Sequence, residues 1–460
     1  MIHREYNSEQ SAFQGGLYET VTNQKKPRKI AEYELQSGRL SAKILPVHLC
    51  NTNPARRGNP PGCFRRNNVI TIVIDPGHGG ENEGTIEDLC GRVEKNMTLQ
   101  TAKYLYKELS GYDDVQVFMT REEDVELSLK ERADFAKSVS ADYMFSVHYN
   151  ASPNHDLYGS EVWIPSEEPL LDKGFDFAIP MLHAWQDEGL YIRGAKTRLN
   201  KSGSNYYGII RESTLLDIPC VILEHCHLDN ETDIGYADED SELRHFAETD
   251  AKVIAGYFGL KKDGETPEIN RNVSIDKSYA FNKSSDPDYC EIGLDKLEGD
   301  TAYIRVKAED YDTFLLYYDY SVDGGLTYSG RIGIPGYDYF EGKYDKEFVC
   351  EAKLAPGRAS GVSVRVYNLF DGMTESNTLW LTALSQKAEE EVPKEEPRLA
   401  ALEEETKDEK NPGIERISFI IIGAAFLAAL IATAAALRAA KRKRRRYTRT
   451  RKRDDDRRLY

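Results

Sequence analysis

The sequence predicts a layered α/β domain, a small all-β sandwich and a single transmembrane helix, in that order along the chain. Between residues 68 and 262, short apolar runs alternate with longer stretches of helical periodicity, which is typical of an α/β domain. Between residues 275 and 385 the runs are short, β-rich and separated by turn residues, which favours a sandwich of the immunoglobulin or fibronectin type III kind. Residues 417–437 carry no charge and are long enough to cross a bilayer.

The elements of the α/β domain follow from the spacing of its apolar residues. We expect strands at residues 69–74, 115–119, 143–148, 161–164 and 220–224. We expect helices at residues 94–109, 125–139, 169–188 and 241–258. Residues 1–67 are polar and punctuated by Pro and Gly, so they predict a mostly irregular leader, and no signal peptide is recognisable in them.

The remaining segments differ in composition from the α/β domain. In the all-β region the expected strands are residues 302–308, 314–321, 348–354 and 362–367, and Asp323-Gly324-Gly325 is a strong hairpin signal. Residues 386–415 are rich in Glu, Lys and Pro and predict an extended acidic linker, because such a composition cannot bury a core. The transmembrane helix is expected at residues 416–438 and a basic tail at residues 439–460.

The basic tail sets the expected membrane orientation. Residues 438–460 carry thirteen Lys/Arg against three Asp, a net charge of +10. The positive-inside rule puts this tail in the cytoplasm and the preceding domains outside the cell. Export of those domains then requires either a start site upstream of Met1 that encodes a signal peptide or an unrecognised signal.

Charge and cysteine content exclude several protein classes. Removing the tail's +10 from the formal net charge of -17 leaves the other residues at -27, which argues against a nucleic-acid partner. The seven cysteines form no CxxC pair, so neither a zinc ribbon nor a disulfide scaffold is indicated. Cys290 and Cys350 are either a disulfide or two buried thiols, and the sequence leaves both alternatives open.

Three polar residues lie at the ends of predicted elements of the α/β domain. His78 follows the first strand in a glycine-rich loop, Glu94 opens the first long helix, and His148 ends another strand. Open α/β sheets bind ligands at such strand ends, and the loop lacks the Lys-Ser/Thr pair of a phosphate-binding P-loop. Two imidazoles and one carboxylate that converge there would hold a zinc ion and leave one position open for water. Taken singly, each residue also has an ordinary structural interpretation, such as Glu94 complementing the helix N-terminus.

The motifs of this domain form an ordered series. They are, in chain order, Ile74-Asp75-Pro76-Gly77-His78-Gly79-Gly80, Glu94-Lys95-Asn96, Met119-Thr120-Arg121 with Asp124, Leu129 with Arg132, Ser146-Val147-His148-Tyr149-Asn150-Ala151, Gly159-Ser160-Glu161-Val162, Pro219-Cys220-Val221-Ile222-Leu223-Glu224, and Asp229-Asn230. Over nearly all of residues 69–258 this series resembles the zinc-dependent N-acetylmuramoyl-L-alanine amidases of the third amidase family. The resemblance implies His78, Glu94 and His148 as Zn²⁺ ligands and Glu224 as the catalytic carboxylate.

The resemblance also implies the reaction, which is hydrolysis of the amide between N-acetylmuramic acid and L-alanine in bacterial peptidoglycan. Zinc polarises the amide carbonyl and acidifies its bound water, while Glu224 carries the water proton to the departing amine. The expected location outside the cell fits this substrate. The alternatives are another zinc peptidase or deacetylase of the cell wall, or a catalytically silent peptidoglycan-binding divisome protein. The complete ligand set and Glu224 favour the enzyme, and a regulatory or divisome partner stays open.

The chain departs from the family after Glu224, where a small residue and an aromatic one are usual and His225-Cys226-His227 stands here. If strand alternation continues to His227, Glu224 and Cys226 lie on one side and both histidines on the other. The departure leaves room for an extra ligand or a histidine that contacts substrate, although a supporting role fits the alternation better.

Three further residues of the family pattern are expected to support the site. We expect Arg121 and Arg132 to be structural ion-pairing residues rather than catalysts. We expect Asp75 to orient a ligand histidine, which is a common arrangement around protein-bound metals.

Overall fold

The computed structural model describes residues 30–36, 39–45, 69–86, 89, 91–282 and 285–383. The predicted linker, transmembrane helix and basic tail lie outside the described residues. Within the described ranges, no helix is both long enough and apolar enough to span a bilayer.

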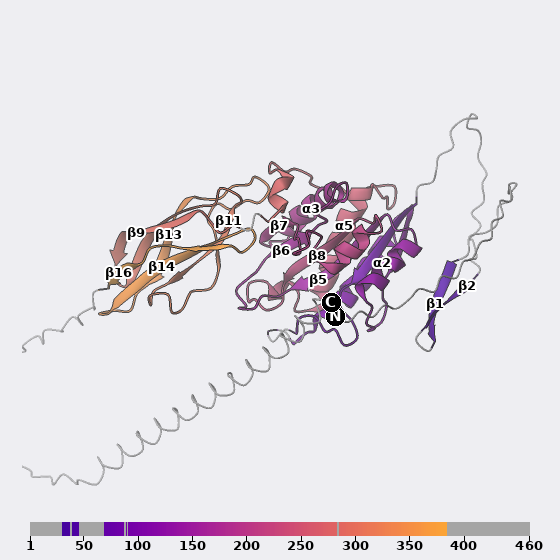
Figure 1. The fold of residues 1–460 in the computed structure, drawn as a ribbon, viewed down its shortest axis with the longest axis horizontal. Coiled ribbons are helices and arrows are strands. Elements are labelled where there is room, and N and C mark those ends of the chain that lie inside the picture. Colours follow the sequence, from indigo (N-terminus) through magenta and orange to yellow (C-terminus); the bar gives the residue numbers. More distant parts are fainter. Residues whose placement is uncertain are drawn as a thin grey trace, which may run out of the picture. The chain divides into compact units, whose positions relative to one another are not determined.

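A six-stranded sheet forms the centre of the α/β domain (Figure 1). Its strand order is β4-β3-β5-β8-β6-β7, and all neighbours are parallel except β6 and β8. The strands are β3 (Ile70–Pro76), β4 (Val115–Met119), β5 (Tyr143–Asn150), β6 (Ser160–Trp163), β7 (Ile192–Lys196) and β8 (Cys220–His227). Because β3, β5 and β8 are parallel neighbours, their carboxyl ends meet at one edge of the sheet. The predicted α/β class is therefore confirmed.

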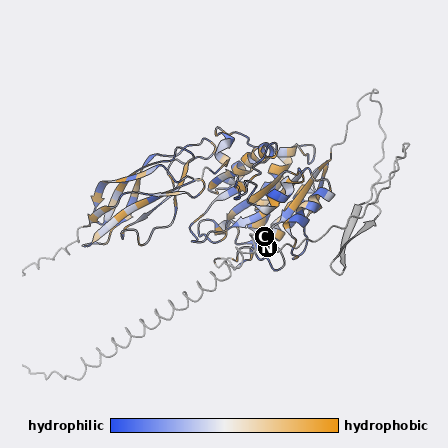
Figure 2. Cartoon of the chain, in the orientation of Figure 1, coloured by the Kyte–Doolittle hydropathy of each residue, from blue (hydrophilic) through white to orange (hydrophobic). Residues whose placement is uncertain are grey.

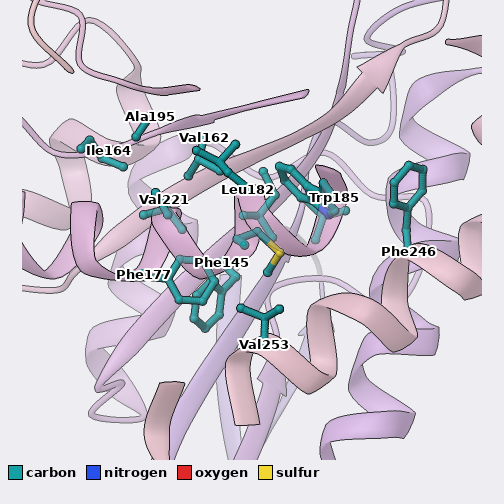
Figure 3. Packing of buried hydrophobic residues seen from close by; sticks show 14 of the residues in the cluster. Phe145, Val162, Ile164, Phe177, Leu182, Trp185, Ala195, Val221, Phe246 and Val253 are labelled. Carbon is teal, nitrogen blue, oxygen red and sulfur yellow. The ribbon is translucent and has the colours of Figure 1, made fainter. Parts of the chain in front are cut away.

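Five helices cover the two faces of this sheet. They are α1 (Glu94–Leu109), α2 (Leu129–Ser138), α3 (Leu170–Asp187), α4 (Gly208–Thr214) and α5 (Asp240–Phe258). Helices α1, α3 and α5 share a core with one face, in which the rings of Phe145 and Phe177 lie side by side (Figure 3). Helices α2 and α4 cover the other face through a smaller cluster. Burial of each large apolar side chain stabilises the fold by about 1.5 to 3 kcal/mol.

Helix α2 begins at Leu129, four residues later than its apolar spacing predicted. The Ser128 hydroxyl accepts a hydrogen bond from the Glu131 backbone N–H, and the Glu131 carboxylate accepts one from the Ser128 backbone N–H. This reciprocal capping box fixes the helix start, because it satisfies two N–H groups that have no partner inside the helix.

Strand β8 is three residues longer than predicted and contains a β-bulge. Its pairing with β5 sets His148 opposite Glu224 and Asn150 opposite His227, so β8 has one extra residue between these pairs. Cys226 joins the core beneath α3 and α5, on the side opposite Glu224. His148 and Asn150 are two residues apart on β5, so their side chains point to the same side of the sheet. Their register partners, Glu224 and His227, therefore also share a side. The predicted alternation is therefore wrong beyond His225.

The β domain, residues 285–383, consists of two antiparallel sheets with a shared core. One sheet has the order β13-β10-β9, and the other has the order β12-β11-β14-β15 with β16 also paired to β14. The strands are β9 (Tyr289–Glu298), β10 (Thr301–Glu309), β11 (Leu315–Ser321), β12 (Ile332–Gly333), β13 (Glu347–Lys353), β14 (Ala359–Asn368), β15 (Met373–Glu375) and β16 (Leu379–Thr382). Figure 2 shows hydrophobic and hydrophilic residues mixed along these strands, and β13 alternates strictly between exposed and buried positions.

Two sequence signals in the β domain have clear outcomes. Asp323-Gly324-Gly325 lies in the connection between β11 and β12, which pair antiparallel as the hairpin signal predicted. Cys290 and Cys350 are both buried, and each keeps its thiol, so the two strands carry no disulfide at these positions. Of the two alternatives for this pair, the structure has the buried thiols.

The N-terminal segment departs from the predicted irregular leader. Strands β1 (Ile30–Gln36) and β2 (Arg39–Leu45) pair antiparallel, with Gln36 opposite Arg39. Both segments alternate apolar and polar residues in the sequence, and two residues that include Gly38 separate them. That combination is a hairpin signal, so the prediction was wrong for these residues.

Candidate metal centre

His78 lies in the loop that follows β3, with a backbone φ of 61°. Its Nδ1 lies 2.9 Å from the Asn82 side-chain oxygen, and donation of the Nδ1 proton to that oxygen leaves Nε2 as the nitrogen with a lone pair. Glycine at position 77 makes room for the second histidine, since a Cβ atom there would lie 2.3 Å from His148 Cε1. The glycine-rich loop thus allows the two imidazoles to approach each other.

Glu94 is the first residue of α1 and is 3% exposed. Its Oε2 accepts a hydrogen bond of 2.8 Å from the Thr85 backbone N–H, and its Oε1 accepts one of 3.2 Å from the Tyr149 backbone N–H. Burial alone would raise the pKa of this carboxyl, but the His78 and His148 imidazoles outweigh burial and hold the pKa well below its usual value. Glu94 is therefore an oriented, ionised carboxylate at a helix N-terminus.

His148 completes the group from the end of β5. His78 Nε2 lies 3.0 Å and His148 Nδ1 lies 3.1 Å from Glu94 Oε1, and the centroids of the two imidazole rings are 4.8 Å apart. Burial lowers the pKa of His148, which favours the neutral imidazole. The structure thus brings the three predicted ligands together.

The donor set fits zinc in both chemistry and spacing. One ligand atom from each of the three residues can be chosen so that all lie within 4.8 Å of one another. Two ligands of a tetrahedral zinc ion with bonds of about 2.1 Å are about 3.4 Å apart, so this group needs only small side-chain movements to surround an ion. Imidazole nitrogen and carboxylate oxygen are ordinary zinc donors, and three protein ligands leave a fourth position open.

Two buried arginines hold the loop that carries His78, each in a different way. Arg121 donates hydrogen bonds of 3.0 and 2.7 Å to the backbone carbonyls of Pro76 and Gly77. Arg132 pairs with Asp75 at 2.8 Å and donates another hydrogen bond of 2.6 Å to the His78 carbonyl. The expected ion pairing is present for Arg132, whereas Arg121 acts mainly on the main chain.

Asp75 has a different role from the one expected of it. Besides Arg132, it accepts hydrogen bonds from the Thr120 and Ser146 hydroxyls at 2.5 and 2.8 Å. These bonds tie β3 to the residue that follows β4 and to the middle of β5. The side chain that orients His78 is Asn82, four residues further along the loop, which the sequence alone did not single out.

Glu224 lies on β8 beside the ligand strand. It is the register partner of His148 on β5 and of Glu161 on β6, and it is 9% exposed. Paired residues on neighbouring strands point to the same side of a sheet, so Glu224 shares its side with His148. The predicted catalytic carboxylate is thus adjacent to the candidate metal ligands.

The two histidines after Glu224 have separate surroundings. His225 is fully buried, with Nε2 2.8 Å from the Asp250 carboxylate and Nδ1 3.1 Å from the backbone oxygen of His148. Both ring nitrogens are therefore engaged, and His225 supports the strand that carries His148. His227 is also fully buried, and its Nδ1 donates a hydrogen bond of 3.0 Å to the Gly159 carbonyl.

The fold and the site define a layered α/β protein with a candidate three-ligand metal centre at the carboxyl edge of its sheet. The chain belongs to the N-acetylmuramoyl-L-alanine amidase family, whose model matches residues 72–256.

Several named relatives share this region. The chain is 30% identical over 196 residues to the amidase CwlM of Bacillus licheniformis. This match covers 42% of this chain and 71% of CwlM. It is 26% identical over 269 residues to the endolysin of Bacillus phage SPP1, covering 57% of this chain and 93% of the endolysin. The probable amidase AmiB of Haemophilus influenzae is 38% identical over 104 residues, and the chain spans about a quarter of its length, with 23% of this chain and 24% of AmiB covered.

Solved structures with similar folds include an N-acetylmuramoyl-L-alanine amidase from Clostridium difficile 630. It has 29% sequence identity and a TM-score of 0.38, and the match covers 42% of this chain and 98% of that structure.

Proposed function

We propose that residues 68–262 hydrolyse the amide between N-acetylmuramic acid and L-alanine in bacterial peptidoglycan, with a bound Zn²⁺ ion. One observation carries the proposal, namely that His78, Glu94 and His148 converge beside Glu224 in a chain of the amidase family. A three-ligand centre with an adjacent carboxylate is the arrangement that metal-assisted hydrolysis of an amide requires.

Each residue of the site has a separate task in this reaction. His78, Glu94 and His148 would hold the zinc ion, which when bound polarises the scissile carbonyl and acidifies a water molecule. Glu224 would accept the proton of that water and deliver it to the departing L-alanine amine. Asn82 would orient the imidazole of His78, and the backbone N–H of Thr85 would orient the carboxylate of Glu94.

Analysis of the cleavage products tests the proposed bond. Digestion of purified peptidoglycan by the full chain is expected to release stem peptides with free L-alanine amines and to create no new reducing sugar ends. Labelling of free amines followed by mass spectrometry identifies the released L-alanine amines, and a reducing-sugar assay of the same digest measures the sugar ends.

The same digest separates the alternatives. A zinc peptidase would create amines at other positions of the stem peptide, and a deacetylase would release acetate. Binding to peptidoglycan without any product would favour the silent divisome protein. Any of these three outcomes contradicts the proposed amidase.

We also propose a cell-membrane location, with a single pass and the catalytic domain outside the cytoplasm. The proposal is supported by the uncharged residues 417–437 and by the basic residues 438–453 that follow them. The substrate lies on the same side, because peptidoglycan is outside the membrane.

Protease treatment of intact, wall-stripped cells tests this orientation. The protease is expected to digest the amidase and β domains and to spare an epitope placed after Tyr460. Immunoblotting of both ends measures the result, with detergent-lysed cells as the control in which the epitope is also lost. Protection of the amidase domain and loss of the epitope in intact cells would invert the proposed orientation.

A further inference from the structure

A buried cluster of charged residues adjoins Glu224 on the edge of the sheet formed by β6 and β7. Its centre is Glu161, whose Oε2 accepts hydrogen bonds of 2.9 Å from Arg193 and 2.8 Å from Lys196. Its Oε1 accepts a hydrogen bond of 2.8 Å from the Asn150 side chain. Glu161, Arg193 and Lys196 are each at most 3% exposed, so these charges interact with little screening by water.

The position of Glu161 connects this cluster to the reaction centre. Glu161 is the register partner of Glu224, and Asn150 lies two residues after His148 on the same strand. Glu161 thus bridges β7 to the two strands that carry His148 and Glu224. A displaced Glu161 would disturb the orientation of both strand ends.

The β domain supplies the outer part of the cluster through the loop between β14 and β15. Asp371 Oδ2 lies 2.9 Å from Arg193 Nη2, and its Oδ1 accepts a hydrogen bond of 2.6 Å from Arg331. The Phe370 ring centre lies 5.7 Å from Lys196 Nζ. Asp371 therefore brings a carboxylate of the β domain into contact with Arg193, which lies on the edge strand β7 of the α/β domain.

The loop that presents Asp371 is held firmly in place. Asp371 has a backbone φ of 65°, a conformation that residues other than glycine rarely adopt. The Asn368 side-chain oxygen accepts hydrogen bonds from the backbone N–H groups of Phe370 and Gly372 at 3.1 and 2.9 Å. A fixed loop can hold Arg193 in one rotamer, as a positioning role requires.

Charge balance explains why Arg193 needs this partner. Glu161 alone faces two buried cations, and Asp371 supplies a second carboxylate, which Arg193 shares with Arg331. Asp156, 3.6 Å from Arg331 Nε, is the third carboxylate beside these three cations. Burial would raise the pKa of Asp371, but Arg193 and Lys196 outweigh burial and lower it, so Asp371 is ionised. Removal of its charge leaves Arg193 with Glu161 as its remaining carboxylate partner and frees the guanidinium to move.

We propose that Asp371 of the β domain is a positioning residue for the amidase reaction, which acts through Arg193 on Glu161 and so on the strand ends that carry Glu224 and His148. The proposal rests on the proposed function. It makes the β domain a part of the catalytic unit rather than a separate targeting module. The rival interpretation is that the Asp371 contact only joins the two domains.

The test compares two interface variants of the full chain on soluble peptidoglycan fragments. Asp371→Asn is expected to lower kcat about tenfold, with KM within about twofold of wild type. Tyr337→Phe is the matched control, because it removes a 2.9 Å hydrogen bond from the same domain interface to the Ile192 carbonyl on β7 but leaves the charged cluster intact. The control is expected to keep kcat within about twofold. Zinc content and thermal unfolding are measured for each variant.

A double-mutant cycle decides whether Asp371 acts through Arg193. In an Arg193→Gln background, Asp371→Asn is expected to change kcat by less than about twofold. In the wild-type background, Asp371→Glu keeps the carboxylate and is expected to have a kcat between those of Asp371→Asn and the wild type. An equal effect of Asp371→Asn with and without Arg193 overturns the proposal. An unchanged kcat in Asp371→Asn alone also overturns the proposal. A fall in kcat overturns it too if the fall equals the loss of bound zinc or of folded protein, or if Tyr337→Phe lowers kcat by the same factor. If the wild-type chain cleaves no peptidoglycan, the proposed function fails, and this proposal fails with it.

Discussion

Replacement of Glu224 with glutamine is expected to lower turnover by about a hundredfold or more, while the chain keeps its full metal content. The amide has nearly the same shape as the carboxylate but cannot accept the water proton or return it to the leaving amine. The three candidate metal ligands are untouched, since Glu224 lies beside them on β8 and outside the group itself. Steady-state kinetics and elemental analysis of the same preparation measure the two quantities.

An exposed glutamate provides a matched control for this experiment. Glu231→Gln makes the same chemical change a few residues after β8, at a position open to solvent, and is expected to leave turnover within about twofold. Unchanged turnover in Glu224→Gln would mean that the base lies elsewhere. His227 would then be tested first, because the bulge in β8 returns it to the side of Glu224, whereas both ring nitrogens of His225 are engaged.

The parts of the fold that local sequence determines were predicted closely. Helix α1 and strand β4 begin and end at the predicted residues, because each has a regular apolar pattern between clear boundaries. The three candidate metal ligands were singled out because each lies at or close to the end of such an element and matches a motif of the amidase family. Parallel pairing of β3 with β5 then brings His78 and His148 to the same edge of the sheet.

The elements that were missed depend on tertiary contacts. Strand β7 carries Arg193 and Lys196, and two cations in five residues do not indicate a buried strand. Their burial depends on Glu161 and on Asp371 of the β domain, which are distant in sequence. The bulge in β8 depends on pairing with β5, so no pattern within β8 alone could have revealed it. Helix α4 spans only seven residues, too few for its periodicity to be recognised.

The wild-type chain is expected to bind about one zinc ion, and the joint replacement of His78 and His148 with alanine is expected to abolish this binding. Glu94 alone would remain of the three ligands, and one carboxylate does not retain zinc through gel filtration. Asn82→Ala keeps all three ligands but removes the hydrogen-bond partner of His78 Nδ1, so its zinc affinity is expected to fall only by about 10- to 100-fold.

A surface histidine supplies the control, and zinc-dependent stability supplies a second readout. His245 lies on the exposed side of α5, so His245→Ala is expected to bind zinc as wild type does. Zinc should raise the unfolding temperature of the wild type and of His245→Ala, since a ligand that binds the folded state stabilises it, and should leave the double variant unchanged. Stoichiometric zinc in the double variant, or its absence from the wild type, would show that these three residues are not the metal centre. Elemental analysis after gel filtration and thermal unfolding with and without added zinc separate these outcomes, and neither measurement requires the chain to be active.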